Sequence, residues 1–465
     1  MSQTAEKALL RSMRSALAIG ALGLSAHAQS ATLTVNTTFD MSLPGATCSL
    51  RKAIDNANAN ATVHAECPPA GDYGADTILF DPAVFPADQL TTSALSGELL
   101  LTDASTTTID GAGAVALDGQ GFVRIFSVSG SAYLEGLTIS NGYTMVGGGG
   151  MLVTGSATID RCYLKDNVAK SSFGGAIFHA AGQLTVKRST LSGNGVGVWP
   201  TTRGGAIYSC GTGSLTVSDS TLGQNYATSS GGAIDSCRPL TVKDSLISGN
   251  YAYYGGGIRF TDLGHFDLVV TGTTLAGNRA TFGGGIAIYG ALSPPSSTPV
   301  LTNDTFHGNL GLGATFGTTG AAIYNVGNST PTITNSTFLA NAFVAVRSVN
   351  APATFVNSVL AGSAQSNCST YPLDAGIVDG GGNIDDGTSC GFTAAAGSLD
   401  NTDPKLVAPP SDNGGPTPTL ALGASSPAFH FASACPDTDQ RGLSRPPTHC
   451  DAGAYEETVF FNAFE

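Results

Sequence analysis

The chain contains little charge and few aromatic residues, with 12% Asp, Glu, Lys and Arg and 8% Phe, Tyr and Trp in 465 residues. Acidic residues outnumber basic ones by 34 to 20, which gives a formal net charge of −14. Such a surface repels nucleic acids and anionic lipid headgroups over a Debye length of about 8 Å. Nucleic acid is therefore excluded as a partner, whereas neutral glycans and divalent cations remain compatible.

Long apolar stretches are also scarce. One uncharged stretch at residues 16–25 follows Lys7, Arg11 and Arg14 and precedes the small-x-small pattern Ala-His-Ala. This arrangement predicts a signal peptide over residues 1–28, because the stretch is too short for a membrane span. We therefore expect a secreted or cell-surface, monomeric protein without a transmembrane helix.

What the chain has in abundance is a repeat. A Leu-Ser-Gly-Asn type of motif recurs at intervals of 25 to 32 residues and ends at Asn167, Asn194, Asn225, Asn250, Asn278, Asn309 and Asn341. A Gly-Gly-Ala-Ile type of motif recurs between them and begins at Gly174, Gly204, Gly231, Gly255 and Gly283. Self-similarity at this period predicts stacked units that bury their apolar faces on one another.

Each unit contains short stretches of strand periodicity separated by turns, as where Leu184 and Val186 alternate with Thr185. The fold class predicted is therefore all-β, a single parallel β-helix whose winding is right-handed by the usual rule for parallel crossovers. The recurring Asn predicts a ladder of stacked amides inside a turn. The glycine pair predicts positive φ or close backbone approach.

The period divides the chain into regions. Ser49 is a suitable N-cap for a helix through Leu50, Ile54 and Ala57, which predicts a helical cap on the first coil. The predicted organisation is a signal peptide at 1–28, an N-terminal capping region at 29–108, β-helix repeats at 109–356, an irregular disulfide-bonded segment at 357–456 and a tail at 457–465.

Nine cysteines in an exported chain indicate disulfides. Spacing predicts Cys48–Cys67, Cys368–Cys390 and Cys435–Cys450. Cys210 and Cys237 occupy the same slot of adjacent repeats, and stacked strands about 4.8 Å apart allow a bond between them. Cys162 aligns with an inward-looking column of serines, so we expect a buried free thiol there.

Two ends of the chain carry recognisable motifs. The sequence Cys-Ser-Leu-Arg-Lys-Ala-Ile at 48–54 resembles the Cys-Ser-Leu-Arg-Glu-Ala-Ile signature of bacterial surface β-helix proteins, with Lys52 in place of Glu. Motifs between Asp412 and Glu456 resemble the choice-of-anchor Q domain that ends exported right-handed β-helix proteins. The repeats are similar to those of chlamydial polymorphic membrane proteins. These resemblances imply fold and export, and they are not tied to one reaction.

Aromatic residues gather in the loop between the Asn and Gly-Gly motifs, and stacked loops would align them on one edge. Exposed rings stack on sugars, so this edge is a candidate glycan site. Its predicted ligand-binding residues are Trp199, Arg203, Tyr226, Tyr251, Tyr253 and Tyr254, with Phe173 and Phe282 in the same loops. The alternative is that each ring folds back over its own coil as packing.

Two acidic residues, Asp219 and Asp244, share a corner slot in adjacent coils and form a candidate catalytic pair. Arg188 holds that slot one coil earlier, and Lys243 lies beside it. A hydrolase needs two carboxylates across the scissile bond, and a lyase needs a base. The alternative, which we favour, is a solvated column of alternating charges.

No cofactor is expected from the sequence, and the histidines show no metal-ligand spacing. Asp385 and Asp386 after a glycine run are a weak candidate for Ca²⁺ and are more typical of a turn. The sequence thus predicts an exported, surface-associated, non-catalytic protein that contacts extracellular glycans or a host surface. A polysaccharide lyase or glycoside hydrolase is the alternative, and a purely structural surface rod is the third.

Overall fold

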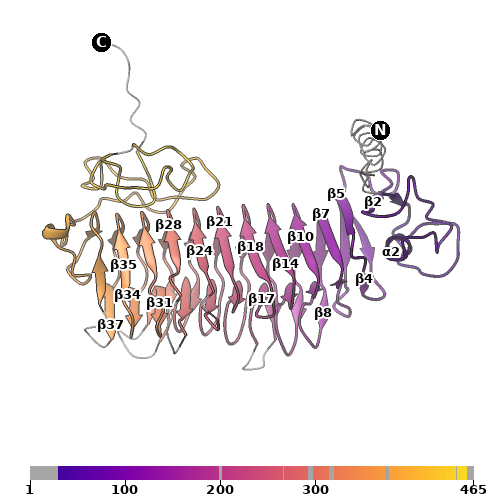
Figure 1. The fold of residues 1–465 in the computed structure, drawn as a ribbon, viewed down its shortest axis with the longest axis horizontal. Coiled ribbons are helices and arrows are strands. Elements are labelled where there is room, and N and C mark those ends of the chain that lie inside the picture. The colour runs from indigo at the N-terminus through magenta and orange to yellow at the C-terminus, as the bar shows by residue number, and fades with distance from the viewer. Residues whose placement is uncertain are drawn as a thin grey trace, which may run out of the picture.

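The computed structural model describes residues 30–197, 202–264, 266–291, 297–313, 319–371, 376–446 and 448–457. The predicted signal peptide, Trp199 and residues 458–465 lie outside these ranges. The chain winds into an elongated stack of coils whose strands lie side by side along the long axis (Figure 1). Nearly all neighbouring strands pair in parallel, which confirms the predicted all-β, parallel β-helical class.

One coil shows the plan of the others. It consists of β13 (Ile177–His179), β14 (Gln183–Lys187), β15 (Thr190–Ser192) and the short β16 (Gly195–Val196). Each of these pairs with its counterpart in the next coil or the previous one. The second and third strands of successive coils belong to a sheet of 23 strands, and the first strands form a sheet of 11.

The strands fall into columns that run along the solenoid. The 11-stranded sheet also contains β4 (Leu99–Leu101), β6 (Phe126–Val128), β9 (Met151–Val153), β17 (Ile207–Ser209), β20 (Ile234–Ser236), β23 (Ile258–Thr261), β27 (Ile286–Tyr289), β31 (Gly320–Val326), β34 (Val344–Val349) and β37 (Ser366–Tyr371). The large sheet begins with β1 (Thr32–Val35), β2 (Thr77–Phe80), β3 (Thr91–Ala94), β5 (Thr106–Asp118) and β7 (Ser131–Ser140).

From β7 onward the large sheet continues as two adjacent columns. The first holds β10 (Ser156–Asp160), β14, β18 (Ser214–Ser218), β21 (Leu240–Lys243), β24 (Leu268–Thr271), β28 (Val300–Thr302), β32 (Thr332–Thr334), β35 (Ala353–Val356) and β38 (Ile377–Asp379). The second holds β11 (Tyr163–Lys165), β15, β19 (Thr221–Gly223), β22 (Leu246–Ser248), β25 (Thr274–Ala276), β29 (Thr305–His307), β33 (Thr337–Leu339), β36 (Val359–Ala361) and β39 (Ile384–Asp385). Two-residue strands after the Asn turn are β8 (Tyr143–Thr144), β12 (Val168–Ala169), β16, β26 (Arg279–Ala280) and β30 (Leu310–Gly311).

The core follows the period of two that the sequence predicts. In β14, Leu184 and Val186 are buried while Thr185 between them is not. Identical residues stack from coil to coil, as where Ile207 is in register with Ile234. Each coil thereby covers the apolar cross-section of the one before it, and this burial drives the stacking.

The two repeat motifs have the structural roles expected of them. Asn167, Asn194, Asn225, Asn250, Asn278, Asn309 and Asn341 form a continuous amide ladder, in which each side-chain Nδ2 donates to the next Oδ1 at 2.9–3.1 Å. In the glycine pair, Gly204 has φ of +67°, and a Cβ on Gly205 would lie 2.1 Å from the Gly232 carbonyl oxygen. One glycine therefore supplies the left-handed backbone, and its neighbour allows the coils to approach.

The first coil is capped as predicted. The helix α2 (Leu50–Ala59) begins after Ser49, whose hydroxyl accepts a hydrogen bond from the Lys52 amide. Its apolar residues join the solenoid core at the indigo end of the molecule (Figure 1). Lys52 is fully buried and paired with Glu66 inside the loop closed by the Cys48–Cys67 disulfide.

The coils are not confined to residues 109–356, the range that the repeat indicates. They already include β4 before residue 109, where it pairs with β6 of the next coil, and they continue through β36, β38 and β39 to Asp385 after residue 356. Cys390 and Phe392 then cover the end of the core, with the Phe392 ring 6.0 Å from that of Phe355.

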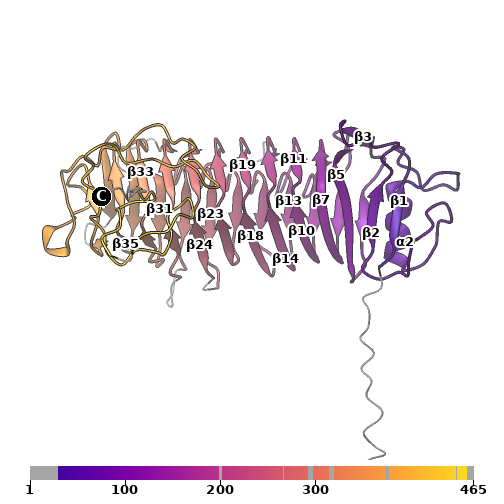
Figure 2. The same ribbon diagram turned by 90° about the horizontal axis from the view of Figure 1, so that it is seen from above.

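The C-terminal segment lies along the side of the coils instead of covering their end. The yellow segment in Figures 1 and 2 runs over the last coils, and its Gln440 exchanges hydrogen bonds with Thr274 and Thr305 at 2.8 and 2.6 Å. A buried ion pair between Arg445 and Glu456 fixes the segment internally.

The disulfides are those that the sequence predicts. Bonds join Cys48 to Cys67, Cys210 to Cys237, Cys368 to Cys390 and Cys435 to Cys450. Cys162 is a buried free thiol. Within the described residues, no helix has the length and apolarity needed to cross a membrane.

Candidate functional site

The aromatic residues of the loops form two columns. In the first, Gly195, Tyr226, Tyr251 and Arg279 follow one another in parallel register. In the second, the register runs Phe173, Arg203, Ser230, Tyr254 and Phe282. The loops therefore stack on one edge as expected. The predicted residues fall into two columns that differ in their exposure to solvent.

Three tyrosines of this edge are open to solvent. Tyr226, Tyr251 and Tyr253 are 43%, 39% and 45% exposed. The rings of Tyr226 and Tyr251 are stacked, with centroids 5.4 Å apart and planes inclined by 3°. We call the surface formed by Tyr226, Tyr251 and Tyr253 the aromatic edge.

The second column behaves as the packing alternative predicts. Phe173 stacks on Tyr208 of β17 at 4.3 Å, and Tyr254 stacks on Phe282 at 5.4 Å. These rings fold over the outer face of the 11-stranded sheet, and burial raises the pKa of the Tyr254 hydroxyl. Tyr254 and the half-buried Arg203 therefore belong to a packed layer beside the aromatic edge. Trp199 lies outside the described residues.

The candidate catalytic pair stands at a corner of the coil. Asp219 and Asp244 both have positive φ, at 49° and 48°, and follow β18 and β21 directly. Burial raises the pKa of Asp244, and the ammonium of Lys243 at 3.5 Å opposes that rise. The corner therefore holds mixed charges, and Asp219 is open to solvent.

Arg188, the fourth candidate, is committed to a residue that sequence reasoning missed. Its Nε donates to Oδ1 of Asp160 at 2.8 Å, and Nη2 pairs with Oδ2. Asp160 is fully buried, also accepts from the Tyr133 hydroxyl and lies 3.5 Å from Lys187 Nζ. The Arg188 hydrogen bonds lower the pKa of Asp160 to about 2. The sequence carries one indication of this site. Glu135, Asp160 and Lys187 occupy the same position in successive coils, so charges of both signs are aligned there.

The Asp385–Asp386 pair lies where β39 ends and the following bend begins. All four carboxylate oxygens accept hydrogen bonds from N–H groups, with Asn367 Nδ2 donating to both residues at 2.6 Å. These donors occupy the positions that a hard cation would take, so the arrangement fits the turn interpretation better than a Ca²⁺ site.

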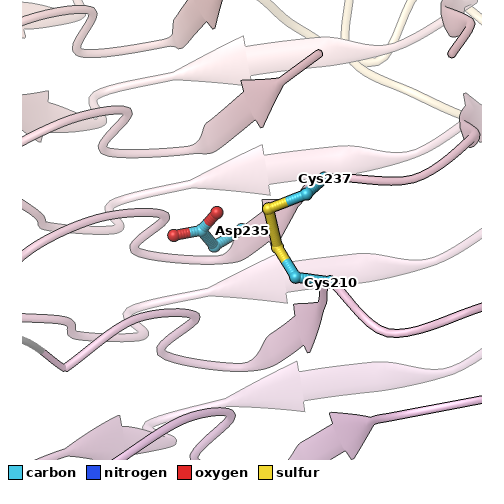
Figure 3. Close-up of side chains that lie close together, drawn as sticks. All are labelled: Cys210, Asp235 and Cys237. Carbon is cyan, nitrogen blue, oxygen red and sulfur yellow. A yellow bond between two sulfur atoms is a disulfide. The ribbon is translucent and has the colours of Figure 1, made fainter. Parts of the chain in front are cut away.

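A second group of potential metal ligands contains sulfur. Asp235 in β20 lies beside Cys210 and Cys237, which directly follow β17 and β20, and the ligand atoms are within 4.8 Å of one another (Figure 3). The two sulfurs are joined in a disulfide, and thiolates rather than disulfides bind metals. Asp235 is buried and paired with Arg259 at 3.2 Å and with the Ser230 hydroxyl. The group is therefore a structural unit of the oxidised chain.

A comparison with known protein families agrees with the fold. The family model for a right-handed beta helix region matches residues 102–272 and 201–338, together more than half of the chain. Among solved structures, the crystal structure of pectate lyase Pel9A matches with a TM-score of 0.48 and 12% identity, over 92% of this chain and 96% of that one. No curated protein matches the sequence.

Proposed function

Because this chain belongs to the family of proteins with a right-handed beta helix region, we propose that it is an exported, surface-associated, non-catalytic protein that contacts glycans through the aromatic edge. Export is supported by the four disulfides, which persist in oxidising compartments. The partner would be an extracellular or surface glycan or a host surface, and adhesion would follow from that contact.

The stacked and exposed pair of Tyr226 and Tyr251 is the observation that carries this proposal. Large rings are usually buried, because each removes 150–250 Å² from water. Here two parallel rings and Tyr253 remain open on consecutive coils. Sugar rings stack on such faces by contact with their C–H groups. Arg279 follows Tyr251 in the column and adds a donor for sugar hydroxyls.

The charged corner gives less support to catalysis. A lyase or hydrolase needs a base and an acid that converge on one cleft. Arg188 and Lys187 are committed to Asp160, and Lys243 lies against Asp244. The acid–base alternative therefore ranks below binding.

The test is a glycan array probed with the purified chain, followed by titration of the best ligand. Tyr226→Ala and Tyr251→Ala should each lower the affinity by about 1 kcal/mol, roughly fivefold. Both side chains are exposed, so the melting temperature should stay within the range of ordinary surface substitutions. Tyr371→Ala is the matched control, because Tyr371 is 62% exposed and lies in β37 at the far end of the solenoid.

Assays for new reducing ends and for unsaturated products accompany the titration. Turnover of a polysaccharide by the wild-type chain, lost in Asp219→Asn or Asp244→Asn, would overturn the non-catalytic proposal. Affinity unchanged in both tyrosine variants would remove the aromatic edge from the binding site.

A further inference from the structure

The coil before the aromatic edge has glycine at two of its surface positions, Gly193 and Gly195. The column of short strands reads Tyr143, Val168, Gly195, Tyr226, Tyr251 and Arg279 in register. The corner slot two residues earlier reads Asn141, Asp166, Gly193, Gln224 and Gly249. The coil of Gly193 and Gly195 is therefore bare at both slots, between the side chains of the coils on either side.

The bare coil forms a trough of defined width. A Cβ placed on Gly195 would meet a single heavy atom of the described residues within 4 Å, the Tyr226 carbonyl oxygen at 3.8 Å. Val168 and Tyr226 on the flanking coils are two strand spacings apart, about 9–10 Å. A flat ring that touches both walls at van der Waals distance needs about 7–8 Å. The trough thus admits one ring between its walls.

One wall of the trough is an aromatic face. Tyr251 covers one face of the Tyr226 ring, because the two rings are parallel and stacked. Gly195 is the register neighbour of Tyr226 on the side away from Tyr251, so the stacked arrangement turns the opposite face of the Tyr226 ring toward the Gly195 coil. The trough therefore differs from a simple gap between coils, because its C-terminal wall is a ring face on which another ring can stack.

A carboxylate lies over the floor. Oδ1 of Asp166 is 2.8 Å from the position that a Cβ on Gly193 would take. An ionised carboxylate only accepts hydrogen bonds, so it selects hydroxyl donors and repels other anions. Asp166 and Val168 also line a cavity of 310 Å³ with Tyr143, Asn141 and Gln120. The surface therefore stays hollow beyond the Val168 wall.

We propose that one pyranose ring of an uncharged glycan binds in this trough, stacked on the free face of Tyr226 and hydrogen-bonded through a hydroxyl to Asp166. The inference rests on the proposed glycan contact and assigns it a position and a ligand class. The carboxylate makes the site selective for neutral sugars over uronates.

The test uses calorimetric titration of the full chain with hexasaccharides of glucose, mannose, galactose and N-acetylglucosamine, and with hexagalacturonate. The wild type should bind at least one neutral hexamer tenfold more tightly than hexagalacturonate. Gly195→Val fills the trough where a Cβ has room and where a β-branched residue suits a strand. It should weaken that binding at least tenfold without lowering the melting temperature. Gly387→Val, at another glycine with ordinary space, is the control.

The second variant tests selectivity. Asp166→Asn keeps an acceptor oxygen and removes the charge, so neutral binding should stay within threefold while hexagalacturonate binding rises at least fivefold. No rise would overturn the role of Asp166. If Gly195→Val binds like wild type while Tyr226→Ala and Tyr251→Ala lose affinity, the trough is wrong and the aromatic edge stands. If no hexamer binds at millimolar concentration, this inference fails, and the array decides separately on the proposed function.

Discussion

The side-chain amide of Asn225 donates to Oδ1 of Asn250 at 3.0 Å, and the same oxygen accepts the backbone amide of Asn225 at 2.9 Å. Both residues are buried. One side chain thus satisfies two donors of the previous coil, and its own amide also donates to the Leu222 carbonyl. The ladder therefore sets the register of the stack, because a shifted coil would leave several buried polar groups without partners.

Asn225→Ala should destabilise the fold by about 1–3 kcal/mol, because it leaves the Asn194 amides without their acceptor. Urea unfolding followed by circular dichroism measures the loss. Ser248→Ala, on the outer side of β22 in the next coil, is the matched control and should stay within about 0.5 kcal/mol. Equal stability of the two variants would contradict the structural role of the ladder.

Cys162 should not react with thiol reagents in the folded chain. Burial raises its pKa to about 12, so the reactive thiolate is almost absent at neutral pH. Native protein should show almost no thiol with an aromatic disulfide reagent, and guanidinium-unfolded, non-reduced protein should show one per chain. Two or more thiols would contradict the four disulfides.

The repeat explains why so much of the solenoid could be predicted. Asn225, Gly204 and the Cys210–Cys237 pair occupy fixed slots, and a parallel stack turns a slot in sequence into a neighbour in space. The side docking of Gln440 against Thr305 could not be predicted, because it joins residues 135 positions apart without a shared period. β38 and β39 were missed for a related reason. They are short and lack the Asn and Gly-Gly motifs.

The site was predicted in part for the same reason. The column of loop aromatics follows from spacing, but whether a ring such as Tyr254 turns inward depends on a partner in the next coil. Asp160 could not be predicted as a buried residue, because a carboxylate at the corner of a coil is usually exposed. It is buried because the side chains of Tyr133 and Arg188, from the coils on either side, cover it.

Asp160 should make the fold sensitive to acid. Its pKa is lowered to about 2 when folded, so its ion pair stabilises the protein above the unfolded pKa near 4 and is lost as the pH falls toward 2. Because Arg188 is half exposed, solvent screening limits the effect to about 1–2 kcal/mol. Urea unfolding of wild type and Asp160→Asn at pH 6 and pH 2.5 measures it. The gap between them should narrow at the lower pH, whereas Asp219→Asn, at an exposed site, should track the wild type.

Asp304 should make the stability of the fold depend on pH in the opposite direction to Asp160. It is fully buried, and its Oδ1 accepts the Thr273 amide at 2.9 Å, while Oδ2 has no hydrogen-bond partner among the described residues. Burial raises the pKa of this carboxyl well above its usual range. The folded state therefore holds a proton that the unfolded state releases, so stability is full below the unfolded pKa and declines as the pH rises.

Asp304→Asn should remove this decline and stabilise the protein by roughly 1–3 kcal/mol at pH 7, because an amide carries no charge to bury. The structure contains a precedent at the equivalent slot of a later coil. There the Oδ1 of Asn383 accepts the Ser358 amide at 2.8 Å, and its Nδ2 donates to the Phe355 carbonyl at 2.9 Å. Val270 is aligned with Phe355 through the register of β24, β28, β32 and β35. Its carbonyl is therefore the expected acceptor for the side-chain amide of an asparagine at position 304. Melting temperatures of both proteins between pH 4 and pH 8 decide the matter. A variant that is less stable than wild type at pH 7, with parallel pH profiles, would show that the buried carboxyl is satisfied as it stands.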